Sequence, residues 1–138
     1  MSSKELLAID DADLHLSILR KIAAQAGFNT TGAASASEAK NLLRTRRFDC
    51  ITLDLSLGEA SGIEVLALLY ELRCPTPVII ISASNDAALN ETVRIGKFLD
   101  VNLFAAMPKP VNLAVLRQTL AQVFSGAPKE ELEAPAGW

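Results

Sequence analysis

The sequence is poor in aromatic residues and in cysteine, and each shortage narrows what the chain can be. Only 5% of its 138 residues are aromatic while 50% are hydrophobic, so the core must be built mainly from aliphatic side chains. The two cysteines, Cys50 and Cys74, follow no ligand spacing, which argues against a disulfide framework or a zinc site. Cys50 opens an apolar run and is expected to be a small buried hydrophobe.

Long hydrophobic runs and an excess of positive charge are also missing. No apolar stretch approaches the roughly 20 residues that a membrane-spanning helix needs, and the first residues lack the long apolar segment of a signal peptide. We therefore expect a soluble, cytoplasmic protein with no membrane partner. The formal net charge is −3, and the one short basic stretch, residues 44–47, fits a solvated helix end. Nucleic acid is not an expected partner.

The length is that of one domain. Strand and helix signals run through residues 4–125, which we predict to be that domain. Residues 126–138 are short of core-forming side chains and rich in proline, alanine and glutamate. We predict that this last segment is a disordered tail.

Short apolar runs and amphipathic segments alternate along the chain. Runs typical of buried parallel strands occur at residues 6–9, 28–33, 48–54, 78–82 and 103–107. Each is followed by a helical pattern, at residues 14–26, 37–46, 63–73, 86–99 and 111–124. Five strand–helix units joined by right-handed crossovers predict an α/β fold with a doubly wound parallel sheet.

Two of the predicted helices have informative apolar patterns. In the first, residues spaced four apart, Leu14, Ile18, Ile22 and Ala26, form the expected inward stripe, which Leu19 and Ala23 flank. In the third, apolar residues cover more than one stripe of residues 63–72. Burial of this helix beneath neighbouring loops is the simpler interpretation, and an interaction face is the alternative.

Polar side chains end four of the five predicted strands. Asp10 and Asp11 follow the first, Asp54 the third, Ser82 the fourth and Lys109 the fifth. Ligands bind beyond the carboxyl ends of parallel strands, so we expect these side chains to converge at one mouth. Three carboxylates, a hydroxyl and an ammonium at one place indicate a phosphoryl-transfer site.

The chemistry of these groups suggests their roles. Adjacent carboxylates repel one another unless a cation lies between them. Since no histidine or cysteine is expected near the cluster, Mg²⁺ is the predicted ion rather than Zn²⁺. Asp54 at the end of the central strand is the candidate nucleophile toward phosphorus. Lys109 and Ser82 would then neutralise and bind the phosphoryl oxygens.

This set of residues resembles the receiver domain of two-component response regulators. The resemblance covers about residues 4–125 and rests on Asp10-Asp11, Asp54, Ser82-Ala83 and Lys109-Pro110. It implies a flavodoxin-like fold with strand order 2-1-3-4-5. It also implies a cis peptide bond between Lys109 and Pro110.

The resemblance assigns functional roles as well. Asp54 would accept a phosphoryl group from a histidine kinase or a histidine phosphotransfer protein. Asp11 would bind Mg²⁺ directly, Asp10 would help through water, and Ser56 would contribute its backbone carbonyl. The chain would catalyse its own phosphorylation and dephosphorylation rather than act as a conventional enzyme. It would signal through a contact with an unidentified downstream protein, or with a second copy of itself in a homodimer.

Four residues outside this set bear on the prediction. The family's usual aromatic residue three positions before the lysine is replaced here by Ala106, and Phe104, expected on the same face, could substitute only imperfectly. Val111 replaces the frequent phenylalanine after Lys-Pro. His15 lies near the acid pair on the first predicted helix, and it is interpreted as a partly exposed helix residue rather than a phosphate carrier.

Two other functions would fit parts of this pattern. A phosphatase of the haloacid-dehalogenase type also uses a strand-end aspartate, but it needs a second aspartate two positions later, where this chain has Ser56. A receiver-fold adaptor that signals without phosphorylation is the second alternative, and the absence of the usual aromatic keeps it open.

Overall fold

Five parallel strands form one sheet in the order β2-β1-β3-β4-β5. The computed structural model describes residues 3–57, 61–82 and 86–126. The strands are β1 (Lys4–Ile9), β2 (Phe28–Ala33), β3 (Cys50–Asp54), β4 (Val78–Ser82) and β5 (Leu103–Pro108). The flavodoxin-like fold predicted from the sequence is therefore confirmed. The predicted tail, apart from Gly126, and Ala83 lie outside the described residues.

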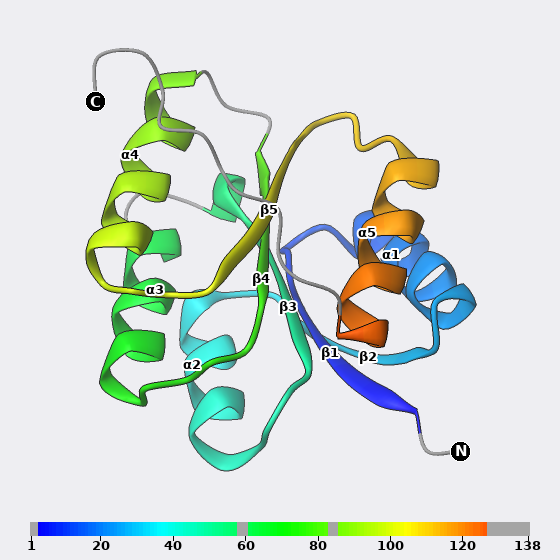
Figure 1. Ribbon diagram of the computed structural model, residues 1–138, viewed down its shortest axis with the longest axis horizontal. Coiled ribbons are helices and arrows are strands. Elements are labelled where there is room, and N and C mark those ends of the chain that lie inside the picture. The colour runs from blue at the N-terminus through cyan, green and yellow to red at the C-terminus, as the bar shows by residue number, and fades with distance from the viewer. Residues whose placement is uncertain (1–2, 58–60, 83–85, 127–138) are drawn as a thin grey trace.

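Helices cover both faces of the sheet, as Figure 1 shows. The face on the left of the view carries α2 (Ala36–Thr45), α3 (Ser61–Glu71) and α4 (Asp86–Phe98), and the other carries α1 (Asp13–Gln25) and α5 (Leu113–Ser125). A 3₁₀ turn, η1 (Leu55–Leu57), follows β3. Two aliphatic core clusters fill the spaces between sheet and helices, one on each face.

Local sequence explains where several helices begin and end. The Ser35 hydroxyl accepts a hydrogen bond from the Glu38 amide at 3.1 Å and so caps α2. Asn112 caps α5 by accepting from the amides of residues 114 and 115. After α1, Gly27 has a φ of +96°, and a β-carbon there would lie 2.6 Å from the Phe124 ring. Glycine is needed at this turn for both reasons.

The inward stripe expected for α1 was wrong in its first half. Leu14 is 70% exposed and Ile18 is 38% exposed, whereas Leu16, Leu19 and Ala23 are buried. A row of residues spaced four apart turns about 40° around the helix at each step, because a turn holds 3.6 residues. The buried stripe instead mixes steps of three and four, and it leaves two aliphatic side chains facing solvent.

The broad apolar pattern of α3 has a simple cause. This helix lies between α2 and α4 on the same face of the sheet (Figure 1). Val65, Leu66, Leu68 and Leu69 are all buried, while Tyr70 is 57% exposed. Burial of α3, the simpler interpretation, is therefore confirmed, but the neighbours that bury it are helices rather than the loops that were predicted.

A β-bulge in β5 changes which face Phe104 occupies. Val78 of β4 pairs with Leu103, but Ile79 pairs with Ala105, so Phe104 is an extra residue in the ladder. Phe104 packs in the core beneath α1 and α5, whereas Ala106 packs against the core beneath α2, α3 and α4. The expectation that these two side chains share a face was wrong, and Phe104 cannot substitute for an aromatic at position 106.

Two remaining features concern the cysteines and the membrane. Cys50 is fully buried, and its burial raises the pKa of the thiol to about 12, which makes it the inert hydrophobe expected. Among the described residues, no helix is both long and apolar enough to cross a lipid bilayer.

Candidate phosphoacceptor site

Asp54 is the last residue of the central strand β3, and its carboxylate is only 2% exposed. Burial raises the pKa of this carboxyl, but hydrogen bonds from Lys109 and Ser56 outweigh burial, so the pKa lies below its usual value. A buried carboxylate that stays ionised at neutral pH is available as a nucleophile or a cation ligand.

Both oxygens of Asp54 have protein partners. Lys109 Nζ donates to Asp54 Oδ2 at 2.5 Å. The Ser56 amide and the Ser56 hydroxyl both donate to Oδ1, at 2.8 and 2.6 Å. The same hydroxyl accepts a hydrogen bond from Lys109 Nζ at 3.2 Å. One serine therefore links the Asp54 carboxylate to Lys109, a role of its side chain that the sequence did not indicate.

Lys109 reaches Asp54 because of the backbone around it. It follows the end of β5, its amide donates to the Ser82 carbonyl at 3.0 Å, and the Lys109–Pro110 bond is cis, as the resemblance implied. Ser82 is itself buried at the end of β4. In the sheet register, Ile81 pairs with Asp54 and Ser82 pairs with Pro108. Ser82 thus ends the strand that lies between those carrying Asp54 and Lys109.

Asp10 lies beside Asp54 at the end of β1 and is 3% exposed. Its Oδ1 accepts from the Ala12 amide at 2.9 Å. Burial raises the pKa of Asp10, the Ala12 amide lowers it, and the Asp54 charge raises it again, so that it lies above its usual value. Asp10, whose pKa is raised, and Asp54, whose pKa is lowered, are adjacent carboxylates, and such a pair forms a donor set that suits a hard divalent cation.

Asp11 differs from its neighbour. It is exposed at the surface, and the group of ligand atoms that lie within 4.8 Å of one another contains Asp10, His15 and Asp54 but not Asp11. The fold thus brings Asp10, Asp54 and Lys109 together, as predicted, whereas Asp11 lies at the surface outside this group.

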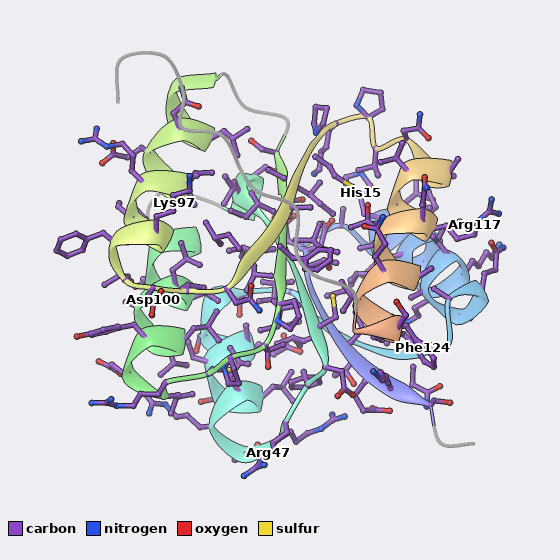
Figure 2. All side chains as sticks on the ribbon, in the orientation of Figure 1. His15, Arg47, Lys97, Asp100, Arg117 and Phe124 are labelled. Carbon is purple, nitrogen blue, oxygen red and sulfur yellow. The ribbon has the colours of Figure 1, made fainter. Side chains whose placement is uncertain are left out.

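His15 is a residue of this site whose contact with the acid pair was not predicted. Its Nδ1 lies 3.2 Å from Asp10 Oδ2, and its side chain is 45% exposed. Figure 2 shows it on the α1–α5 side of the sheet. The expectation that no histidine lies near the acidic cluster was wrong. The signal was available, because a helix that starts directly after a strand presents its first turn at the strand-end mouth.

Comparison with known proteins decides the family. Residues 6–121 match the family model described as response regulator receiver domain. The chain belongs to the response regulator receiver family. Receiver domains of this family serve phosphorylation-based two-component signalling.

Curated relatives are similar over much of this receiver domain. A protein-glutamate methylesterase/protein-glutamine glutaminase from Hahella chejuensis is 30% identical over 107 residues, which cover 77% of this chain and 30% of that protein. The response regulator protein PilR of Pseudomonas aeruginosa is 28% identical over 137 residues, covering 98% of this chain and 29% of PilR. The chain therefore spans less than a third of the length of these two relatives.

Solved structures agree on the fold. A response regulator from Colwellia psychrerythraea superposes with a TM-score of 0.78 at 25% identity, covering 91% of this chain and 99% of that one. A Francisella receiver domain superposes with a TM-score of 0.75 at 23% identity, covering 90% of this chain and 98% of that one.

Proposed function

We propose that this receiver domain is a phosphorylation-dependent switch in which Asp54 accepts a phosphoryl group from a phosphohistidine. The observation that carries the proposal is the buried, ionised Asp54 carboxylate held by Lys109 and Ser56 beside Asp10. The donor is a histidine kinase or a histidine phosphotransfer protein, and the output is a protein–protein contact. Membership of the receiver family and the strand-end placement of these groups support it.

The proposed reaction is a displacement at phosphorus. An Asp54 oxygen forms a bond to phosphorus while the phosphorus–nitrogen bond of the donor breaks, and the leaving imidazole takes up a proton. The product is an aspartyl phosphate. Oδ2 of Asp54 accepts one hydrogen bond, from Lys109, and a carboxylate oxygen has two lone pairs, so this oxygen can attack phosphorus. The Lys109 ammonium can then pass from the carboxylate to a phosphoryl oxygen.

Mg²⁺ is the cation we assign to the site, held by Asp10, Asp11, Asp54 and the Ser56 carbonyl. When bound, it would offset the negative charge on the transferring phosphoryl oxygens. Asp10 and Asp54 fit this assignment by their position and charge. We further assign Ser82 to hydrogen-bond a phosphoryl oxygen from the end of β4.

A groove beside the site fits the phosphodonor. It has a volume of about 620 Å³ and is lined by apolar side chains of α1, of the β5–α5 connection and of the start of α5: Leu14, Ile18, Pro110, Val111 and Leu113. Asp10 and Lys109, which flank Asp54, also line it. Leu14 is 70% exposed and Leu113 is 44% exposed. A protein that delivers a phosphohistidine to Asp54 must cover the surface next to this mouth, and exposed aliphatic side chains there favour binding.

One observation favours an adaptor that keeps the fold but signals without phosphate. With Ala106 on the face covered by α3 and α4, and Phe104 on the other, no aromatic side chain of β5 faces that side. Phosphorylation would have to reach an output surface by another route. Partner binding that is unchanged by Asp54→Asn would establish this second function. The predicted homodimer and cytoplasmic location remain predictions.

Intact-protein mass spectrometry tests the proposed function. The protein is incubated with acetyl phosphate and Mg²⁺, with chelator in place of Mg²⁺, and as the Asp54→Asn variant. We expect one added phosphoryl group with Mg²⁺ and none in the other two arms. A folded protein that gains no phosphoryl group and binds no beryllofluoride would favour the adaptor instead.

A further inference from the structure

His15 places a nitrogen donor among the oxygen donors of the phosphoacceptor site. Asp10, His15 and Asp54 each offer one ligand atom, and these three atoms lie within 4.8 Å of one another. Ligands of one transition-metal ion lie about 2.0–2.2 Å from it, and hence roughly 3–4 Å from each other. Small side-chain rotations would bring the three atoms onto one ion.

Hydrogen bonds from the protein hold the Asp10 and Asp54 carboxylates. Asp10 and Asp54 are buried, the Ala12 amide holds Asp10 Oδ1, and the ring nitrogen lies 3.2 Å from Asp10 Oδ2. His15 itself stands in the first turn of α1, at the mouth of the groove, with its side chain 45% exposed. An ion that enters from solvent can therefore meet the imidazole and both carboxylates together.

A nitrogen donor changes which cations the site prefers. Mg²⁺ takes oxygen ligands almost exclusively, whereas imidazole suits Zn²⁺, Co²⁺, Ni²⁺ and Cu²⁺. We propose that His15, with Asp10 and Asp54, binds a divalent first-row transition-metal ion of the Co²⁺ or Zn²⁺ type, which competes with Mg²⁺ at the phosphoacceptor site. The regulatory meaning of this competition rests on the proposed function, but the binding itself does not.

The test uses the fact that His15 is the only histidine in the sequence. In untagged, ¹⁵N-labelled protein its ring signals need no assignment. We expect Zn²⁺ to shift the Nδ1 resonance strongly, and Mg²⁺ at saturation to leave it nearly in place. A Zn²⁺ titration that saturates both carboxylates without moving Nδ1 would overturn the proposal.

Calorimetry on variants isolates the contribution of the ring. Carboxylates alone also bind Co²⁺ and Zn²⁺ more tightly than Mg²⁺, so the decisive quantity is the change on mutation. His15→Ala should weaken Co²⁺ binding at least tenfold and change Mg²⁺ affinity less than twofold. Ser17→Ala, an exposed position of the same helix, should change neither. A Co²⁺ affinity within twofold of wild type in His15→Ala would refute the proposal.

The same variants separate this inference from the proposed function. With each protein's own rate of labelling by acetyl phosphate in Mg²⁺ as the reference, added Co²⁺ should inhibit the wild type more than His15→Ala. If Asp54 accepts no phosphoryl group in any protein but the Nδ1 shift and the Co²⁺ difference persist, the proposed function fails and the metal site stands. If Asp54 is phosphorylated and neither metal effect appears, the reverse holds.

Discussion

Lys109 Nζ lies 2.5 Å from Asp54 Oδ2, and this pair joins the end of β5 to the end of β3 across the carboxyl edge of the sheet. The Asp54 side chain is 2% exposed and that of Lys109 is 17% exposed. The ammonium compensates for the burial of a charged carboxylate in the resting protein. It is also the group best placed to neutralise a phosphoryl oxygen on that carboxylate.

Replacing Lys109 by methionine should therefore lower both stability and phosphorylation rate. The buried Asp54 loses the Lys109 ammonium, which we expect to cost about 2 kcal/mol of the free energy of unfolding at pH 7. The Ser56 hydrogen bonds remain and limit the loss. Urea denaturation in chelator measures the first effect, and acetyl phosphate labelling measures the second.

The loss of unfolding free energy in Lys109→Met should depend on pH. Because the folded-state pKa of Asp54 is lowered from 3.8, the ion pair contributes stability that is present above this value and lost as the pH falls through the lowered pKa. The gap between wild type and variant should thus be widest near neutral pH and should narrow in acid. A gap that stays constant from pH 7 to pH 3 would contradict the assignment.

Removing the Asp10 charge should stabilise the protein in the absence of divalent cations. The folded-state pKa of Asp10 is raised above 3.8, so its charged form costs stability at neutral pH, and this cost disappears as the pH falls toward the unfolded-state value. Asp10→Asn should increase the free energy of unfolding by about 1 kcal/mol at pH 7.

The adjacent residue supplies the control for this prediction. Asp11 is exposed, and Asp11→Asn should change stability by less than about 0.5 kcal/mol. Thermal unfolding compares the two variants in chelator and, in separate samples, in Mg²⁺ without chelator. Equal effects of both substitutions would show that general charge reduction, rather than the buried position of Asp10, is responsible.

Two glycines with positive φ allow backbone strain to be separated from crowding. Gly27 has a φ of +96°, and a β-carbon added there would crowd the Phe124 ring. Gly126 has a φ of +76°, and a β-carbon added there would have no neighbouring atom within 4 Å. Gly126→Ala should cost about 1 kcal/mol through backbone strain alone. Gly27→Ala should cost about 2–3 kcal/mol, because the Phe124 ring must also move. Urea denaturation of both variants is the measurement, and equal losses would remove the role given to Phe124.

The groove next to Asp54 can be tested by separating protein donors from small ones. Ile18→Asp places a charge on its exposed aliphatic surface and should slow transfer from a phosphorylated histidine phosphotransfer protein at least tenfold. Labelling by acetyl phosphate, which needs no docking surface, should change less than twofold. Phe98→Asp, at an 88% exposed position outside the groove, is the matched control. If Phe98→Asp slowed transfer from the phosphotransfer protein equally, the groove would not be the surface that this donor binds.

Much of this molecule was predictable because strand order and site chemistry depend on patterns that are local in sequence. The apolar runs gave the five strands, and the polar residue after each run gave Asp10, Asp54 and Lys109. The β5 bulge was not predictable in this way, because the extra residue, Phe104, appears only in the register with β4. Strict alternation therefore put its side chain on the wrong face.

The errors around α1 have a related origin. Whether Leu14 is buried depends on how closely α5 approaches the first turn of α1, which no residue of α1 itself encodes. The position of His15 near the acid pair was readable from the sequence, but its contact with Asp10 was not, since that contact depends on how the turn after β1 orients the ring. Tertiary placement, rather than helix periodicity, decides both.

The most direct test of the account is to locate the phosphoryl group chemically. After acetyl phosphate treatment in Mg²⁺, borohydride reduces an aspartyl phosphate to homoserine, and peptide mass spectrometry then identifies the altered position. We predict homoserine at position 54 and at no other aspartate, with none formed in chelator. Homoserine at position 10 or 11, or an unmodified position 54 in a folded protein, would contradict the central claim that Asp54 is the phosphoacceptor.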